Sequence, residues 1–197
     1  MNLIDIIGAV IGLFYIVSEY RADRWFWPLS ILMSVFYAII CFTNGVYANG
    51  AIYCYNFAMS VYGLLVWRGV LQSKDGGERP ITSCPARNWL WIVPATVVLS
   101  LLLIPLLHAL GESTYTLTNG TVVDLSVLDG IAAALSIISM VMVAQKWWQQ
   151  WFVCMAIEPL MIAIYLLTGN YASALLYAVF LVFCIFGVIK WKKESIS

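Results

Sequence analysis

Glu158 is the residue whose type and surroundings point most directly to chemistry. It lies within a long apolar stretch and directly precedes Pro159. A charged side chain at membrane depth costs about 2.5 to 3.5 kcal/mol on insertion scales, so its presence needs a reason. Proline removes a backbone donor and can leave carbonyl groups free to line a cavity. We predict that Glu158 binds a ligand; the alternative is a protonated glutamate bonded to a neighbouring helix.

Polar side chains at helical spacing occur in the other apolar stretches. Tyr53, Asn56 and Ser60 recur at intervals of three and four residues, so they share one helix face. Such a face contacts protein or a cavity rather than lipid, and ligand binding and hydrogen bonding between helices would both explain it. Further candidates with hydroxyl groups or polar-tipped rings are Ser30, Ser34, Tyr37, Ser136, Ser139, Tyr165 and Tyr177.

Asp5 and Asp129 each stand at the start of an apolar stretch. The positive end of a helix dipole favours a carboxylate at such a position, which is a structural explanation. The functional alternative is a pair of carboxylates at an outer entrance that attracts cationic solutes.

No constellation typical of an enzyme is present in the sequence. His108 is the only histidine, no residue pairs with it at metal-ligand spacing, and the phosphate-loop, GxSxG and HExxH motifs are absent. Four cysteines lie in apolar stretches and are interpreted as small apolar fillers. The sequence therefore argues against an enzyme, a metal site and a cofactor.

Seven apolar stretches must position these residues. The chain has 197 residues, of which 63% are hydrophobic and 10% charged, and one membrane span needs about 20 apolar residues. We predict spans at roughly 3–20, 25–43, 47–67, 88–110, 122–144, 148–168 and 170–190. Polar segments at 72–87 and 111–121 are expected to be loops that flank the fourth span.

All ten Lys and Arg residues fall on one side of this arrangement. They are Arg21, Arg24, Arg68, Lys74, Arg79, Arg87, Lys146, Lys190, Lys192 and Lys193. Because cationic loops are retained in the cytoplasm, we predict an outer amino end and an inner carboxyl end. The net charge of zero and the scattered basic residues argue against nucleic acid as a partner.

All nine tryptophans fall near the predicted inner side. An interfacial belt would explain most of them. Belts normally form on both faces of a membrane, however, so we predict that some of these rings close the inner mouth of a pathway.

The first and last three spans align without a gap at an offset of 124 residues. Matched residues include Asp5 with Asp129, Trp27 with Trp151, Gly45 with Gly169, Tyr53 with Tyr177, Gly63 with Gly187 and Trp67 with Trp191. An offset of four spans returns the chain to the same side, so both halves have the same orientation. Parallel repeats of this kind build carriers with a central substrate site.

The ordered set of these motifs resembles the PnuC family of vitamin-precursor carriers over nearly the full chain. The matching segments are RWFWP at 24–28, NGVYANG at 44–50, LDGIAAALS at 128–136, QKWWQQW at 145–151 and IYLLTGNYASALLYAVFL at 164–181. The resemblance implies facilitated diffusion of nicotinamide riboside, trapping of the product by a cytosolic kinase, and a homotrimer in the membrane. Relatives of the same fold carry thiamine, and others riboflavin or nucleosides.

Departures from the family pattern bear on the ligand. Phe26 replaces an amide in the WNWP motif, and Tyr53 and Met140 stand where riboside carriers tend to have glutamine. Loss of these amides favours a ligand with fewer hydroxyl groups, so thiamine is a serious competitor. Glu158 suits either ligand, because both carry a positive ring nitrogen.

The sequence thus predicts an all-α integral membrane protein of seven transmembrane helices, built from two parallel three-helix repeats joined by a linker helix (3 + 1 + 3, SWEET-like). Within one membrane domain, 1–197, the repeats are 1–68 and 122–192 and the linker is 88–111. We predict a carrier in the bacterial inner membrane, for nicotinamide riboside or alternatively thiamine; a ligand sensor or a membrane-integral enzyme are further alternatives. The predicted ligand-binding residues are Phe26, Trp27, Ser34, Tyr37, Tyr53, Asn56, Ser136, Trp151, Glu158 and Tyr177.

Overall fold

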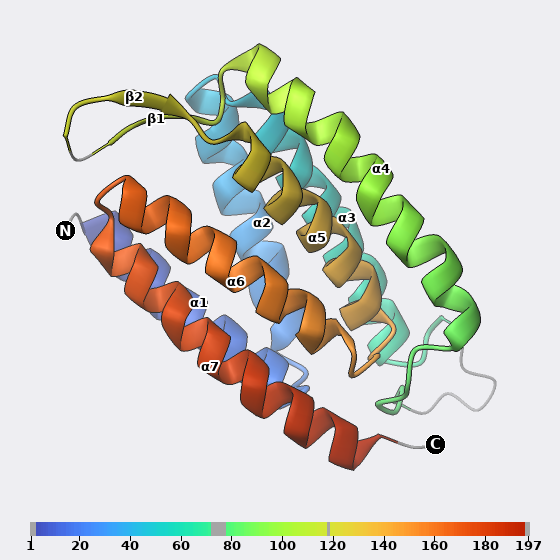
Figure 1. The fold of residues 1–197 in the computed structure, drawn as a ribbon. Helices are drawn as coiled ribbons and strands as arrows, with labels where there is room; N and C mark the ends of the chain where they lie inside the picture. The colour runs from blue at the N-terminus through green and yellow to red at the C-terminus, as the bar shows by residue number, and fades with distance from the viewer. Residues whose placement is uncertain (1–2, 72–77, 118, 196–197) are drawn as a thin grey trace.

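The computed structural model describes residues 3–71, 78–117 and 119–195, with side chains from residue 10 onward. Within these residues the chain forms seven α-helices and one two-stranded antiparallel sheet (Figure 1). The elements are α1 (Leu3–Tyr20), α2 (Phe26–Thr43), α3 (Tyr47–Trp67), α4 (Ala86–Leu110), β1 (Thr114–Thr116), β2 (Val122–Asp124), α5 (Ser126–Ala144), α6 (Gln150–Leu167) and α7 (Tyr171–Glu194). The prediction of an all-α chain with seven helices is confirmed.

Five of the described helices, α2 and α4 to α7, are long and apolar enough to cross a membrane. Helix α3 is more polar because it carries Asn49, Asn56 and Ser60. Helix α1 contributes an apolar segment from Val10 to Tyr20 among the residues whose side chains are described.

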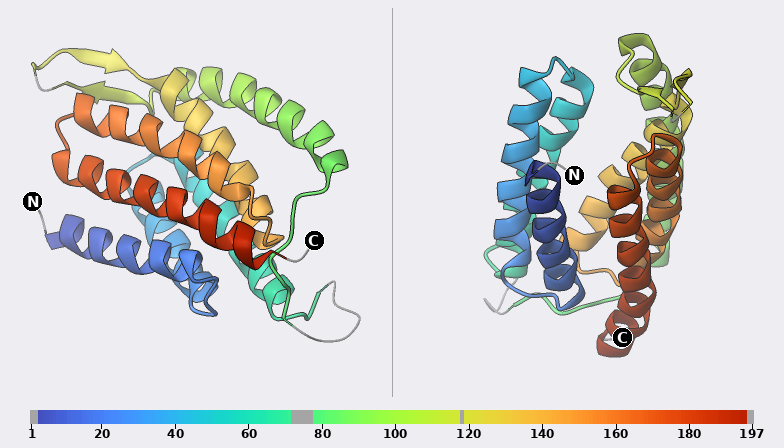
Figure 2. Two further views of the ribbon diagram at one scale, coloured as in Figure 1. Left: turned by 60° about the horizontal axis from the view of Figure 1, so that its bottom comes forward. Right: turned by 90° about the vertical axis from the view of Figure 1, so that its left-hand side faces the viewer.

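The helices form two layers. Helices α1 to α3 make one layer and α4 to α7 the other (Figure 2). Helix α2 packs against α3 and α6 against α7, while the α3–α5 and α1–α7 contacts join the layers and α4 covers α5. The chain termini lie at opposite ends of the bundle (Figure 1). We call the end that carries the strands the hairpin end, and the other end, which holds buried tryptophans, the tryptophan end.

The polar segment at 111–121 is a β-hairpin rather than an irregular loop, and this corrects the predicted start of the fifth helix. Strands β1 and β2 pair in antiparallel register, so α5 begins at Ser126 instead of residue 122. The Asp124 carboxylate accepts hydrogen bonds from Ser126, whose backbone N lies 2.7 Å from Oδ1, and contacts the His108 ring. Bonds from Ser126 and His108 lower the pKa of Asp124 to about 2. His108 therefore has a partner, which its sequence context did not reveal.

The segment at 72–87 was expected to be a linker, and residues 72–77 lie outside the described part. The remainder is tied to the α5–α6 connection at the tryptophan end. The Thr82 N–H donates to the Lys146 carbonyl at 3.0 Å and the Trp148 N–H donates to the Thr82 carbonyl at 3.1 Å. The Cys84 N–H donates to the Gln149 side chain at 2.8 Å. This segment is thus a strap across the end of the bundle.

Several local geometries recur 124 residues apart. Ala22 and Lys146 are the non-glycine residues with positive φ among those described, at 52° and 50°. Gly45 and Gly169 have φ of 75° and 76°. A Cβ built on Gly63 would lie 2.2 Å from the Trp27 ring, and one on Gly187 would lie 2.4 Å from the Trp151 ring.

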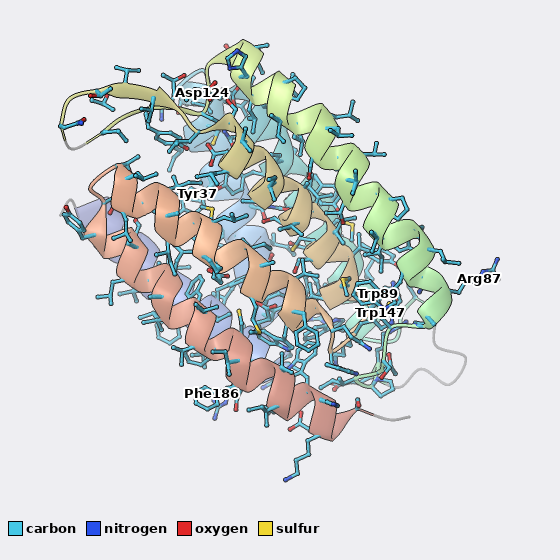
Figure 3. The ribbon with its side chains drawn as sticks, viewed as in Figure 1. Tyr37, Arg87, Trp89, Asp124, Trp147 and Phe186 are labelled. Carbon is cyan, nitrogen blue, oxygen red and sulfur yellow. The ribbon has the colours of Figure 1, made fainter. Side chains whose placement is uncertain are left out.

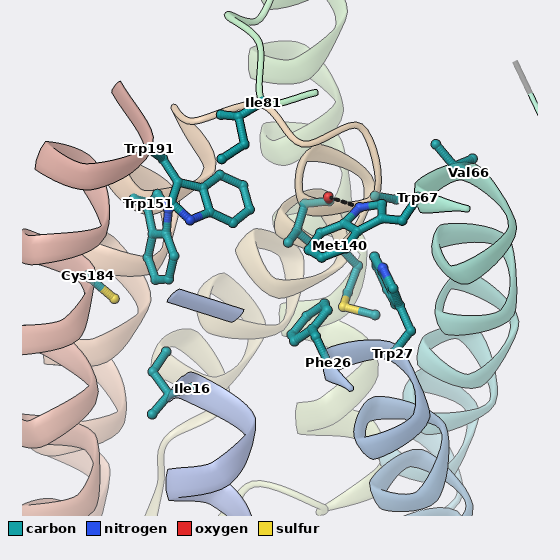
Figure 4. Packing of buried hydrophobic residues seen from close by; sticks show 12 residues of the cluster. Ile16, Phe26, Trp27, Val66, Trp67, Ile81, Met140, Trp151, Cys184 and Trp191 are labelled. Carbon is teal, nitrogen blue, oxygen red and sulfur yellow. Dashed lines mark hydrogen bonds between the residues drawn. The ribbon is translucent and has the colours of Figure 1, made fainter. Parts of the chain in front are cut away.

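Four of the nine tryptophans are core residues at the tryptophan end rather than members of an interfacial belt. Trp27, Trp67, Trp151 and Trp191 are buried together, and Figure 4 shows them packed with Phe26, Met140 and Ile81. Two of the four indole N–H groups bond across the layers: Trp67 donates to the Val143 carbonyl at 3.1 Å, and Trp191 donates to the Tyr20 carbonyl at 3.0 Å. We call these four rings and Phe26 the tryptophan cluster.

The surface around this core is apolar. Phe186 points away from the bundle on α7, and Arg87 projects from the start of α4 (Figure 3). Trp89 lies beside buried Trp147 at the tryptophan end. An exposed apolar surface over such long helices suits a lipid environment rather than water.

Candidate functional site

A cavity of about 310 Å³ lies between the two layers. Its walls come mainly from α1 and α3 on one side and from α5, α6 and α7 on the other. Pockets that bind small molecules typically begin at about 300 Å³, so a vitamin-sized ligand matches this volume. The cavity borders the core at the tryptophan end, since Ile16, Met140 and Val143 line the cavity and also pack in the same buried cluster as the four tryptophans.

Glu158 faces this cavity from the middle of α6. Its side chain is 7% exposed, and its Oε2 has no hydrogen-bond partner among the described residues. A buried carboxylate oxygen without a partner carries an unfavourable desolvation free energy. The position therefore suits a group that receives its partner from a bound ligand.

The polar face of α3 divides between two roles. Tyr53 and Asn56 line the cavity, and the buried Asn56 Oδ1 has no hydrogen-bond partner among the described residues. Ser60 instead bonds Ser30 of α2, with 2.7 Å between the hydroxyl oxygens. Ser60 thus takes part in hydrogen bonding between helices, whereas Tyr53 and Asn56 face the cavity.

Two stacked tyrosine pairs border the cavity towards the hairpin end. Tyr53 stacks on Tyr37 with ring centroids 5.3 Å apart, and Tyr177 stacks on Tyr165 at 5.2 Å. Tyr53 and Tyr177, which are 124 residues apart in the sequence, line the cavity. Flat aromatic faces with polar tips suit a ring-shaped ligand.

Asp129 also lines the cavity, from the first turn of α5. It accepts a hydrogen bond of 2.8 Å from the Tyr115 hydroxyl of the hairpin. Burial raises the pKa of Tyr115, and the charge of Asp129 raises it further, so the phenol remains a donor. The other predicted entrance carboxylate, Asp5, lies outside the residues with described side chains.

Five predicted ligand-binding residues meet at the cavity. They are Tyr53, Asn56, Ser136, Glu158 and Tyr177.

The other five are not among the residues that line the cavity. Phe26, Trp27 and Trp151 are fully buried in the tryptophan cluster. The Ser34 hydroxyl donates to the Ser30 carbonyl of its own helix at 2.7 Å, and Tyr37 lies behind Tyr53 as its stacking partner. Sequence pattern does not distinguish a ring that lines a cavity from one that packs beneath it.

Glu19 is a cavity residue that sequence reasoning missed. It lines the cavity from the last turn of α1, and its side chain is 5% exposed. It stands next to Tyr20 and Arg21, at the predicted end of a span, where a charged residue is ordinary. The available signal was the helix dipole, which disfavours a carboxylate at a carboxyl-terminal turn.

The family model described as nicotinamide mononucleotide transporter matches residues 2–193. The chain belongs to this family. It is 23% identical over 179 residues to a nicotinamide riboside transporter PnuC of Haemophilus influenzae, covering 90% of this chain and 73% of the relative. It is 22% identical over 197 residues to a transporter of the same name from Neisseria mucosa, covering 95% and 71%.

A solved structure has the same fold. The crystal structure of the vitamin B3 transporter PnuC superimposes with a TM-score of 0.68 at 21% identity, covering 94% of this chain and 79% of that one. Members of the nicotinamide mononucleotide transporter family and these relatives are transporters, so the chain is a multi-pass membrane transporter and not an enzyme.

Proposed function

We propose that this transporter carries a small cationic vitamin precursor across the bacterial inner membrane. The observation that carries the proposal is the unpartnered Glu158 carboxylate in the cavity between the two layers. No Lys, Arg or His is among the described residues that line this cavity. An acidic, aromatic cavity without basic groups favours a flat ligand that bears positive charge.

Nicotinamide riboside is the first candidate, because two relatives that match most of this chain are named nicotinamide riboside transporters. Thiamine is the second. Tyr53 and Met140, which replace amides of the riboside carriers, both line the cavity and so act directly on ligand choice. Phe26 is buried in the tryptophan cluster, so its replacement of an amide in the WNWP motif bears less directly on ligand choice.

We further propose that 1–68 and 122–192 are parallel repeats joined by a linker helix at 88–111. The matched Trp–Gly contacts and backbone angles at an offset of 124 residues support this division. The hairpin end would face the exterior, since the basic residues follow α1, α3 and α5 or lie in the first turn of α4 and the last turns of α7. A homotrimer and a cytosolic kinase that consumes the product complete the proposal.

Transport would then proceed by facilitated diffusion. The two repeats rock around the cavity, and the tryptophan cluster closes its inner end in the conformer described above. Two conformers of similar free energy suffice for exchange, and phosphorylation inside the cell makes uptake directional.

The test is uptake by purified protein in liposomes. Radiolabelled nicotinamide riboside and thiamine are offered separately, without ATP or an ion gradient, and protein-free liposomes serve as the control. We expect equilibration of one cation, and accumulation when the matching kinase and ATP are enclosed. Strict dependence on an imposed gradient would reject facilitated diffusion, and binding without flux would identify a sensor instead.

Replacement of Tyr53 by Gln tests the choice between the two vitamins. The added amide can hydrogen-bond ribose hydroxyls or a carboxamide, so we expect relative affinity to shift towards the riboside by about fivefold to tenfold, as for one neutral hydrogen bond. Tyr53→Phe is the matched control, because it removes the hydroxyl and adds no amide. Equal effects of the two substitutions on the affinity ratio would contradict the prediction.

A further inference from the structure

We infer that Glu19 is a second ligand-binding carboxylate, which together with Glu158 forms the site for the positive charge of the ligand. This inference rests on the proposed function and names the group that recognises the charge. The two acids come from opposite layers, α1 and α6, and line the same cavity.

The Glu19 side chain is buried, and no cationic side chain pairs with it among the described residues. Glu19 is 5% exposed, yet it is absent from the ion pairs of the described residues, which are His108–Asp124 and Lys190–Glu194. Two lysines at the tryptophan end are engaged elsewhere. Lys190 Nζ bonds the Tyr20 carbonyl at 3.0 Å, and Lys146 Nζ lies 4.4 Å from the centroid of the Trp67 ring. A buried carboxylate therefore faces the cavity with no protein cation to balance it.

Among the described residues, the groups that interact with Glu19 are polar or acidic and include no cation. Its carboxyl lies beside the side chain of fully buried Gln150. Tyr15, also a lining residue, lies close enough to interact electrostatically with both Glu19 and Glu158. Glu19 and Glu158 line the same cavity from opposite layers. A cation bound in that cavity would stabilise the charged form of both carboxyl groups.

Neither acid is matched by an acid in the other half of the chain. At an offset of 124 residues, Glu19 corresponds to Val143 and Glu158 to Ser34. Val143 also lines the cavity, so the two halves offer a carboxylate and an isopropyl group at matched places. The helix dipole opposes a carboxylate at the end of α1, so local stability does not explain this acid. An asymmetric ligand with its charge at one end does explain it.

The experiment compares a cationic ligand with its uncharged counterpart. Nicotinamide riboside is paired with its reduced 1,4-dihydro form, and thiamine with its neutral aminopyrimidine alcohol fragment. Dissociation constants are measured by calorimetry in detergent for the unaltered protein, Glu19→Gln and Glu194→Gln. Glu194 is a half-exposed carboxylate remote from the cavity. We expect Glu19→Gln to weaken binding of the cation by about tenfold or more, as for one charge-assisted contact, and to change the uncharged ligand by less than about threefold.

Glu19→Asp provides a second variant if the glutamine form does not fold. It keeps the charge but withdraws it by one methylene, so we expect a smaller loss confined to the cation. Unchanged cation affinity, or equal weakening of both ligands, would overturn the role of Glu19. If the unaltered protein binds neither cation, the proposed function falls, and this inference falls with it.

Discussion

Glu158→Gln is expected to weaken binding of the cationic ligand by about 1.5 to 3 kcal/mol, roughly 10-fold to 100-fold in Kd. Glu158 faces the cavity with one oxygen that has no partner among the described residues, so we expect a bound ligand to supply its contact. Glutamine has nearly the same shape and loses the charge, which isolates the electrostatic contribution. Calorimetry with nicotinamide riboside and thiamine measures the effect.

Thermal unfolding without ligand distinguishes a binding role from a structural one. An uncharged amide costs less to bury than a carboxylate, so the unfolding temperature of ligand-free Glu158→Gln should be unchanged or higher. A lower unfolding temperature with unchanged affinity would show that Glu158 holds helices together. Glu194→Gln, far from the cavity, should alter neither quantity.

Combination of Glu158→Gln with Glu19→Gln measures whether the carboxylates act on one charge. Residues that share a partner give non-additive free energies, whereas independent sites add within about 0.5 kcal/mol. If both acids hold the same cation, removal of the second should cost less after removal of the first.

Five of the described helices were predictable because each is an apolar stretch long enough to span a bilayer. The hairpin was not recognised, although Asn119 and Gly120 stand between residues of strong β propensity. An Asn-Gly pair between such residues is a strong hairpin signal. Gly120 has a φ of 82°, which the turn requires. Hydropathy, the pattern that predicts membrane spans, does not distinguish two strands of three residues each from a loop.

The candidate site was predictable where polar spacing identified a helix face, as for Tyr53 and Asn56. It was not predictable for Trp27 and Trp151, because a tryptophan that packs on glycine and one that stacks on a ligand look alike in sequence. Glu19 was not predicted as a cavity residue, because its position two residues before Arg21 is typical of the polar boundary of a span. The structure shows that its side chain is buried. Tertiary packing decides these positions, and spacing along one helix carries no information about it.

Gly63→Ala is expected to destabilise the protein by about 1 to 3 kcal/mol, even though alanine gains about 1 kcal/mol in helix propensity. The added Cβ would lie 2.2 Å from Cη2 and Cζ2 of Trp27, a side chain that is fully buried and has little room to move. Gly12→Ala is the matched control, because its Cβ would approach Phe180 only to 3.3 Å. Thermal and denaturant unfolding in detergent measure the difference.

Trp27→Phe should rescue Gly63→Ala, because the shorter ring withdraws the outer indole atoms that the new methyl group meets. We expect Trp151→Phe to rescue Gly187→Ala less well. At Gly187 the nearest atoms are Cδ2 and Cε2 of Trp151, at the fusion of the two rings, where a phenylalanine ring also has atoms. A double-mutant cycle should therefore give a large favourable coupling for Gly63 with Trp27 and a smaller one for Gly187 with Trp151. Additive losses in the first pair would show that Trp27 is not the group that excludes a side chain from position 63.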